Sequence, residues 1–258
     1  ATVLSQLVAL IWQLWIFSNP KELIRLKRGI YSLRGDLVKN IIGIGISPFS
    51  MNVCACMVVI FINNQLVRFG GDMSVGAFGI ANRIVFIFVM FVMGINQGMQ
   101  PIAGYNYGAQ KLDRMMQVVK LSIIAATAIM ILGWFLAMLA PRQCVSLFTT
   151  DQHLIDTTVH GMQRMMLMLP IVGYQMVITN FFQCIGKVKI SIFLSLSRQL
   201  LFLLPALALL PMWFGLDGVW LAQPVSDLIA SVVTAWIMIV YMHKFKLQHK
   251  ENQYGRQE

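Results

Sequence analysis

Charged residues are scarce in this chain of 258 residues: only 12% are Asp, Glu, Lys or Arg, whereas 58% are hydrophobic. A globular domain in water carries about 25% charged residues. The mean hydropathy is +0.71, and several apolar runs are long enough to cross a bilayer. The composition therefore excludes an ordinary water-exposed domain. It predicts an all-α integral membrane protein whose main partner is the lipid bilayer.

Catalytic motifs are lacking as well. The sequence contains no H-E-x-x-H, G-x-S-x-G or Walker A pattern, and these are the patterns that would indicate a metalloprotease, a serine hydrolase or an ATPase. Asp227 is the one carboxylate deep inside an apolar run. We therefore predict no enzyme activity and no cofactor.

Cysteine is rare, and its spacing does not favour a metal site. The chain has four cysteines. Cys54 and Cys56 form a C-x-C pair with no third or fourth ligand nearby in the sequence, whereas a structural zinc site needs four. The net charge of +10 is divided among short clusters between apolar runs. That pattern is typical of the cytoplasmic loops of membrane proteins and does not indicate nucleic-acid binding.

The first segment, residues 1–39, has no initiating Met and opens inside an apolar run. We expect residues 1–17 to be the end of a spanning helix in a longer protein. In residues 21–39, Lys and Arg alternate with Leu and Ile. This pattern predicts an amphipathic link in the plane of the interface, with a solvated loop as the alternative.

Residues 40–243 form the predicted membrane lobe, and residues 244–258 form a basic, polar tail. A turn is expected at Gly70 and Gly71, and a tight turn at Asp217 and Gly218. Each apolar run is long enough, or nearly so, for a helix across about 30 Å of hydrocarbon. The six predicted spans are 40–67, 74–100, 121–141, 162–186, 199–216 and 219–242.

The basic clusters predict the orientation of these spans. Clusters rich in Lys and Arg alternate with loops that hold almost none, and most basic residues fall on one side. Because the basic side of a membrane protein is cytoplasmic, the carboxyl terminus is predicted to be cytoplasmic. Arg198 is counted here with the basic loop before the fifth span.

Residues 94–114 combine glycines, amides and a proline at the end of the second span. Pro101 lacks a backbone donor, so a helix that reaches it is expected to kink or stop. One hypothesis is a broken helix end that faces a cavity, where irregular backbone is tolerated at membrane depth. The other is an ordinary helix exit with a glycine-rich turn.

Polar and charged side chains within the spans are the candidate functional residues. Arg83 and Arg164 should face a cavity or a partner, or extend to the interface. Asp227 should be paired or should take part in coupling, with Arg83, Arg164 and Arg198 as candidate partners. The amide and hydroxyl groups could line one substrate cavity or bond neighbouring helices; they are Asn52, Asn82, Gln97, Gln100, Tyr174, Gln175, Asn180 and Gln183.

Four stretches resemble one family. QGMQPIAGYNYGAQKLDRM (97–115) is similar to the end of the eighth helix and the following loop of multidrug and toxic compound extrusion (MATE) transporters. The others are FINNQLVRFGGDMSVGAFGIANRI (61–84), LPIVGYQMVITNFFQCIGKVKISIFLSLSRQLLFLLP (169–205) and WLAQPVSDLIA (220–230). The resemblance covers essentially the whole chain, and implies helices seven to twelve, preceded by the end of helix six and the link between lobes.

The resemblance implies a function. Members of the family export cationic or amphipathic drugs by alternating access, in exchange for Na⁺ or H⁺. The implied location is the bacterial cytoplasmic (inner) membrane, and the implied partner is an amino-terminal lobe. An essential Asp on helix one lies outside this chain, and the carboxylates that another branch uses on helices seven and ten have no counterpart here. Residues 1–258 alone are therefore not expected to transport. The alternatives are a lipid-linked saccharide flippase of the same superfamily and a structural or sensory membrane protein.

Overall fold

The structure is a computed structural model that describes residues 2–18 and 35–254, all but a few of them in helices. The chain divides into two units, residues 1–49 and 50–258. The first unit holds α1 (Thr2–Ser18) and the start of α2 (Gly35–Gly108). The predicted amphipathic link at 21–39 falls mainly on residues 19–34, which lie outside the described residues.

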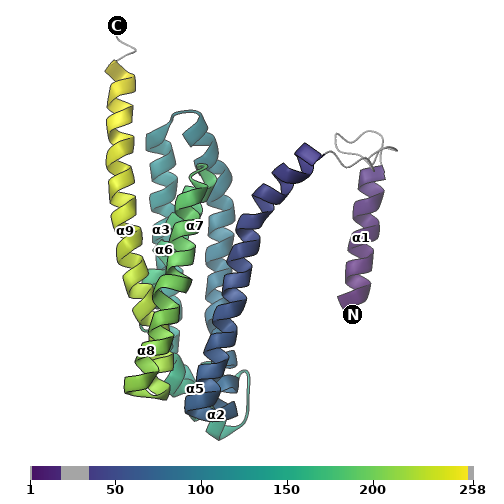
Figure 1. Ribbon diagram of the computed structural model, residues 1–258, viewed down its shortest axis with the longest axis vertical. Helices are drawn as coiled ribbons and strands as arrows, with labels where there is room; N and C mark the ends of the chain where they lie inside the picture. Colours follow the sequence, from purple (N-terminus) through teal and green to yellow (C-terminus); the bar gives the residue numbers. More distant parts are fainter. Residues whose placement is uncertain (1, 19–34, 255–258) are drawn as a thin grey trace. The chain divides into compact units, whose positions relative to one another are not determined.

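The second unit is a bundle of helices that run alongside one another (Figure 1). It contains most of α2 and all later elements. These are α3 (Leu112–Leu139), α4 (Pro141–Ser146), α5 (Gln152–Met165), α6 (Leu169–Cys184), α7 (Val188–Leu196), the π-helix η1 (Ser197–Leu203), α8 (Leu204–Phe214) and α9 (Leu216–Tyr254).

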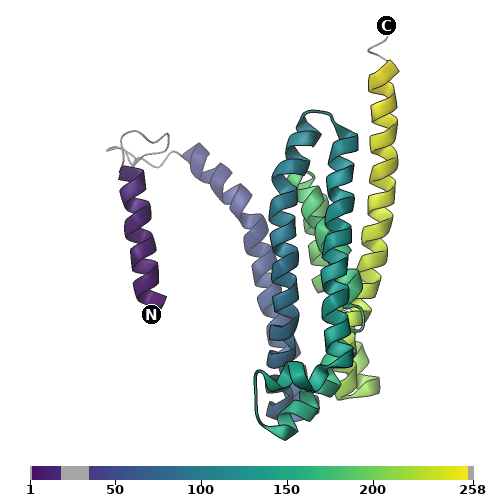
Figure 2. The same ribbon diagram turned by 180° about the vertical axis from the view of Figure 1, so that it is seen from behind.

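Gly71 divides α2 into two arms. Its backbone angles are φ 69° and ψ −176°, a conformation that residues with a Cβ rarely adopt. The described part of this apolar helix, Asn52–Gly108, has 57 residues and would measure about 85 Å if straight, far more than a bilayer needs. Figure 2 shows instead that α2 turns back on itself at its lower end. The turn expected at Gly70 and Gly71 is confirmed.

The predicted number of spans agrees with this geometry. Four described helices are long and apolar enough to cross a membrane, and the bent pair α5–α6 can form a fifth. Because Gly71 separates Asn52–Gly108 into two arms, the described residues from Asn52 onward can make six passes. The fold is the all-α membrane lobe expected from the hydropathy.

α3 shows how the sequence builds the bundle. Its buried residues recur every three or four positions: Met115, Val119, Ser122, Ala126, Met130, Gly133 and Ala137. This spacing places them on one face of a helix. That face packs against α6, where a Cβ on Gly173 would lie 2.9 Å from the carbonyl oxygen of Ala126. The other face exposes large apolar side chains such as Leu121, as a helix in contact with lipid requires.

Three predictions about the spans and their turns were wrong. The tight turn expected at Asp217 and Gly218 lies instead at Gly215, which has a φ of 57°, because Asp217 and Gly218 belong to the first turn of α9. The fifth span begins at Val188 rather than at residue 199, so Arg198 lies within it and not in a basic loop. The second span does not break at Pro101, because α2 stays helical to Gly108 and its non-helical residue is Gly71. Residues 94–114 therefore form an ordinary helix exit, with a turn in which Gln110 has a φ of 59°.

Candidate functional site

A pocket of about 180 Å³ lies among α2, α5, α6, η1 and α9. Seven of its eleven lining residues are apolar, and its polar groups come from three of these elements. It is lined by Asn82, Val85, Phe86, Val89, Met165, Leu169, Val172, Met176, Arg198, Gln223 and Asp227.

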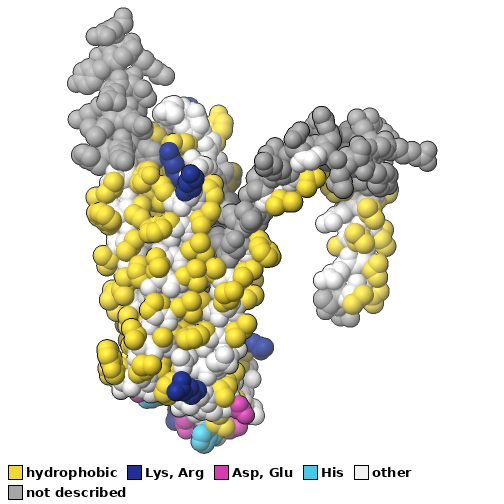
Figure 3. All heavy atoms as spheres, viewed as in Figure 1, with side chains coloured by type: hydrophobic (Ala, Val, Ile, Leu, Met, Phe, Trp, Pro, Cys, Tyr) yellow, Lys and Arg dark blue, Asp and Glu magenta, His cyan; other side chains and the backbone are white. Residues whose placement is uncertain are grey.

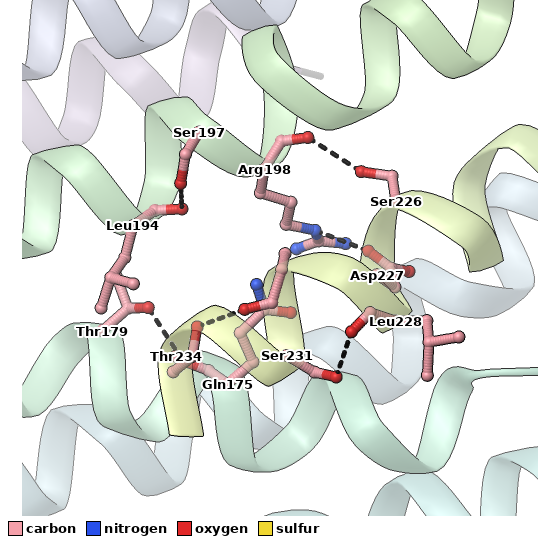
Figure 4. Close-up of polar contacts among 11 residues, drawn as sticks. Gln175, Thr179, Leu194, Ser197, Arg198, Ser226, Asp227, Leu228, Ser231 and Thr234 are labelled. Atoms are coloured by element: carbon pink, nitrogen blue, oxygen red, sulfur yellow. Dashed lines mark hydrogen bonds and ion pairs between the residues drawn. The ribbon is translucent and has the colours of Figure 1, made fainter. Parts of the chain in front are cut away.

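An ion pair forms the polar side of this pocket. The Nε atom of Arg198 donates to the Oδ1 atom of Asp227 at 2.7 Å, as Figure 4 shows. Asp227 is only 5% exposed. Since a buried carboxylate is costly unless it is paired, Arg198 is the group that allows a charge at this depth.

The depth of the pair follows from the length of α9. Asp227 lies eleven positions after Leu216, the first residue of α9. At 1.5 Å per residue this is about 16 Å along the helix, or roughly the middle of a bilayer. Intramembrane charges at such depth are rare and usually functional.

The π-helix η1 carries Arg198 to the pocket. Pro205 follows it, lacks a backbone donor and would crowd the carbonyl group of Leu201 four residues earlier. A wider π turn before the proline relieves that conflict, and π segments often occur at functional sites. A hydrogen bond from the Ser226 hydroxyl to the Arg198 carbonyl oxygen, at 2.9 Å, joins η1 to α9.

A second break borders the pocket. α5 ends at Met165, α6 begins at Leu169, and the two helices are bent by 56°. Both of these residues line the pocket. Pro170 lies in the first turn of α6, where its missing donor is least harmful. Broken helices beside a polar pocket are typical of the substrate sites of secondary transporters.

The eight amide and hydroxyl candidates do not gather in this pocket. Asn82 lines it, and Gln175 belongs to the cluster around the ion pair (Figure 4). Gln175 is 3% exposed, and its Oε1 atom has no hydrogen-bond partner among the described residues. Asn52, Gln97 and Gln183 are exposed.

The other three candidates show the alternative role of bonding between helices. Gln100 donates from Nε2 to the Oδ1 atom of Asn180 at 3.1 Å, which joins α2 to α6. The Tyr174 hydroxyl donates to the carbonyl oxygen of Ser231 at 2.6 Å, which joins α6 to α9. A substrate-binding role for these residues stays a prediction.

The other two arginines lie away from the pocket. Arg83 is exposed and forms no ion pair with the described residues. Arg164 pairs with Asp217 at 2.8 Å, beside His160. Of the three arginines considered as partners for Asp227, Arg198 is the one that lies against it.

Sequence reasoning missed Gln223 and the pocket role of Arg198. Gln223 is next to Pro224, which lies inside α9, so a polar residue beside an intramembrane proline was the available signal. Arg198 was assigned to a loop because hydropathy alone did not extend the span back to Val188.

The fold and the site together describe a class: an α-helical membrane lobe with a charged pocket where its helices are broken. The MatE family model matches residues 46–207. The chain therefore belongs to the MatE family, and it is not an enzyme.

Named relatives agree with this assignment. The chain is 23% identical over 246 residues to the multidrug export protein MepA of Staphylococcus aureus, and 24% identical to that of Staphylococcus haemolyticus. The matches cover 95% of this chain and 53% of each relative. The chain thus spans about half the length of these relatives, which agrees with the expected carboxy-terminal lobe.

Solved structures show the same fold. The MATE multidrug transporter DinF-BH is 36% identical, with a TM-score of 0.77 over 92% of this chain and 53% of that one. An inward-facing multidrug resistance MATE family transporter has a TM-score of 0.82 at 20% identity, over 95% of this chain and 57% of that one.

Proposed function

We propose that this chain is one lobe of a secondary active multidrug efflux transporter. It works with an amino-terminal lobe by alternating access, in a bacterial cytoplasmic membrane, and exchanges cationic or amphipathic drugs for Na⁺ or H⁺. The names of MepA and of DinF-BH support the drug class. The Arg198–Asp227 pair inside the pocket is the observation that carries the proposal, because charges at membrane depth commonly mark substrate or ion pathways.

The distribution of charge supports an inward carboxyl terminus. Acidic and histidine side chains gather at the lower end of the bundle, whereas Lys and Arg side chains appear near both of its ends (Figure 3). Lys111 lies in the loop between α2 and α3, Arg114 lies in the first turn of α3, and Lys187 lies in the loop between α6 and α7. The positive-inside rule makes the end with these two loops cytoplasmic.

The walls of the pocket favour drug export over saccharide flipping. A flippase for an anionic lipid-linked saccharide would need a strongly cationic cavity, and the pocket offers one arginine that is already paired with Asp227. Arg83 and Arg164 do not line it. Phe86 and the flexible side chains of Met165 and Met176 suit varied apolar substrates instead. A polar pocket also argues against a purely structural or sensory protein.

Drug accumulation in pump-deficient cells tests the proposal. Cells that express the complete gene are expected to accumulate several-fold less rhodamine 6G than cells with an empty vector. Collapsing the Na⁺ gradient or the pH gradient separately identifies the coupling ion, because only the gradient that drives exchange should abolish the difference. Equal accumulation in both cell lines, with the protein present in the membrane, would refute drug efflux.

Asp227 is proposed to contribute to coupling, and Asp227→Asn tests this role. The variant keeps the shape of the side chain and removes the charge that a proton or cation would neutralise. We expect efflux to lose most of its dependence on the driving gradient. Unchanged export with unchanged ion dependence would leave Asp227 a purely structural partner of Arg198.

A further inference from the structure

We propose that the Arg198–Asp227 pair is a dipolar subsite that selects amphiphiles with a carboxylate as well as a cationic group. The inference rests on the proposed efflux function and names the substrates that this lobe prefers. It assigns Arg198 as a specificity-determining residue.

The geometry of the pair leaves binding groups available. The hydrogen bond joins Nε of Arg198 to Oδ1 of Asp227, so the two terminal guanidinium nitrogens form no hydrogen bond with the described residues. The Arg198 side chain is 28% exposed, and both residues line the pocket. A guanidinium presents its terminal N–H groups in a fixed fork that fits a carboxylate. Arg198 can therefore hold Asp227 and an incoming carboxylate at the same time.

Charge compensation weakens the attraction of the pocket for a simple cation without abolishing it. A lone buried carboxylate would attract a cationic drug strongly, but the charge of Asp227 is already balanced by Arg198 at 2.7 Å. A ligand with one positive charge then meets a nearly neutral pair. A zwitterionic ligand can place its carboxylate near Arg198 and its cationic group near Asp227, so both of its charges are matched.

The size and the walls of the pocket define the rest of the ligand. A volume of about 180 Å³ is below the roughly 300 Å³ of a small-molecule site that encloses its ligand. The pocket therefore receives the polar head of the ligand, and the apolar body of the ligand extends beyond the pocket. Phe86, Val89 and Met176 supply apolar surface beside the charges, and Asn82 and Gln223 supply further amide groups.

Two matched dyes separate the charge classes. Rhodamine 110 is a zwitterion with a free carboxylate, and rhodamine 123 is its methyl ester, a cation with the same ring system. Binding to the complete transporter in lipid nanodiscs is measured by fluorescence polarisation. We expect rhodamine 110 to bind about tenfold more tightly, which corresponds to one good charge-assisted interaction.

Variants of Arg198 and Asp227 test whether the preference for rhodamine 110 comes from this pair. Arg198→Gln should weaken rhodamine 110 about tenfold and leave rhodamine 123 unchanged or tighter, because Asp227 loses its partner. The double variant Arg198→Gln with Asp227→Asn removes both charges with little change of shape. It should bind the two dyes equally. The matched control is Arg142→Gln, at a surface pair with Asp156, which should keep the wild-type ratio.

The outcomes distinguish this inference from the proposed function. Wild-type protein that exports drugs but binds both dyes equally would overturn the dipolar subsite while leaving efflux intact. A preference for rhodamine 110 that survives in the double variant would also overturn it. Selective binding without any efflux would instead retain the subsite and refute the transport proposal.

Discussion

Replacing Asp227 by alanine is expected to destabilise the bundle by about 3–5 kcal/mol, because Arg198 would keep a charge within the bundle without its partner. The interaction is short, at 2.7 Å, and Asp227 is almost fully buried. The measurement is the thermal unfolding of the purified transporter in detergent, followed by loss of the monodisperse peak in gel filtration.

A surface pair gives the matched control. Arg142 and Asp156 lie 2.6 Å apart but are 68% and 60% exposed, so water already solvates both charges. Asp156→Ala should therefore change the free energy of unfolding by less than about 1 kcal/mol. The comparison separates the effect of burial from the effect of deleting an aspartate.

Removing both charges of the buried pair should recover most of the loss. Arg198→Gln with Asp227→Asn leaves two neutral groups that can hydrogen-bond, and replacing a whole buried pair is often nearly neutral. The structure shows a pair that is shielded from water. If the Asp227→Ala variant unfolded at the same temperature as the wild type, this shielding would be contradicted.

Gly173→Ala is expected to destabilise the bundle by about 1–3 kcal/mol through overpacking. Its new Cβ would lie 2.9 Å from the Ala126 carbonyl oxygen and 3.1 Å from the amide nitrogen of Thr127. These are backbone atoms of α3, so the helices must separate. Because Val172 and Met176 on α6 line the pocket, we also expect weaker dye binding. Thermal unfolding and fluorescence polarisation measure the two effects.

Gly94→Ala is the control with the same substitution in another helix of the bundle. A Cβ at Gly94 meets no described atom within 4 Å, and alanine favours the helix over glycine by about 1 kcal/mol. The variant should be as stable as the wild type or slightly more stable. Equal effects of the two substitutions would contradict the close packing of α3 on α6.

Hydropathy predicted the architecture because long apolar runs separated by short polar loops leave few alternatives in a bilayer. The turn at Gly71 followed from the glycine pair, and the expectation that Asp227 is paired followed from the cost of a lone carboxylate in an apolar run. These features depend on local sequence alone.

The partner of Asp227 and the shape of the pocket depend on packing between distant segments. Arg198 seemed to belong to a loop because Lys187 and Lys189 precede it, and nothing local predicted the π turn that places it opposite α9. In the same way, Asn82 and Gln97 are equally polar residues of α2, yet the first lines the pocket and the second does not. The two residues lie fifteen positions apart, about 22 Å along the helix, so depth in the bundle decides that difference as well as the side of the helix.

Efflux from proteoliposomes tests the central claim most directly. The complete transporter, wild type or with Arg198→Gln and Asp227→Asn, is reconstituted with rhodamine 6G under an imposed Na⁺ or proton gradient. We predict gradient-driven dye movement by the wild type and loss of most of it in the double variant. Equal rates of dye movement for both proteins, or dye movement that is independent of both gradients, would contradict a coupled transporter that works through this pocket.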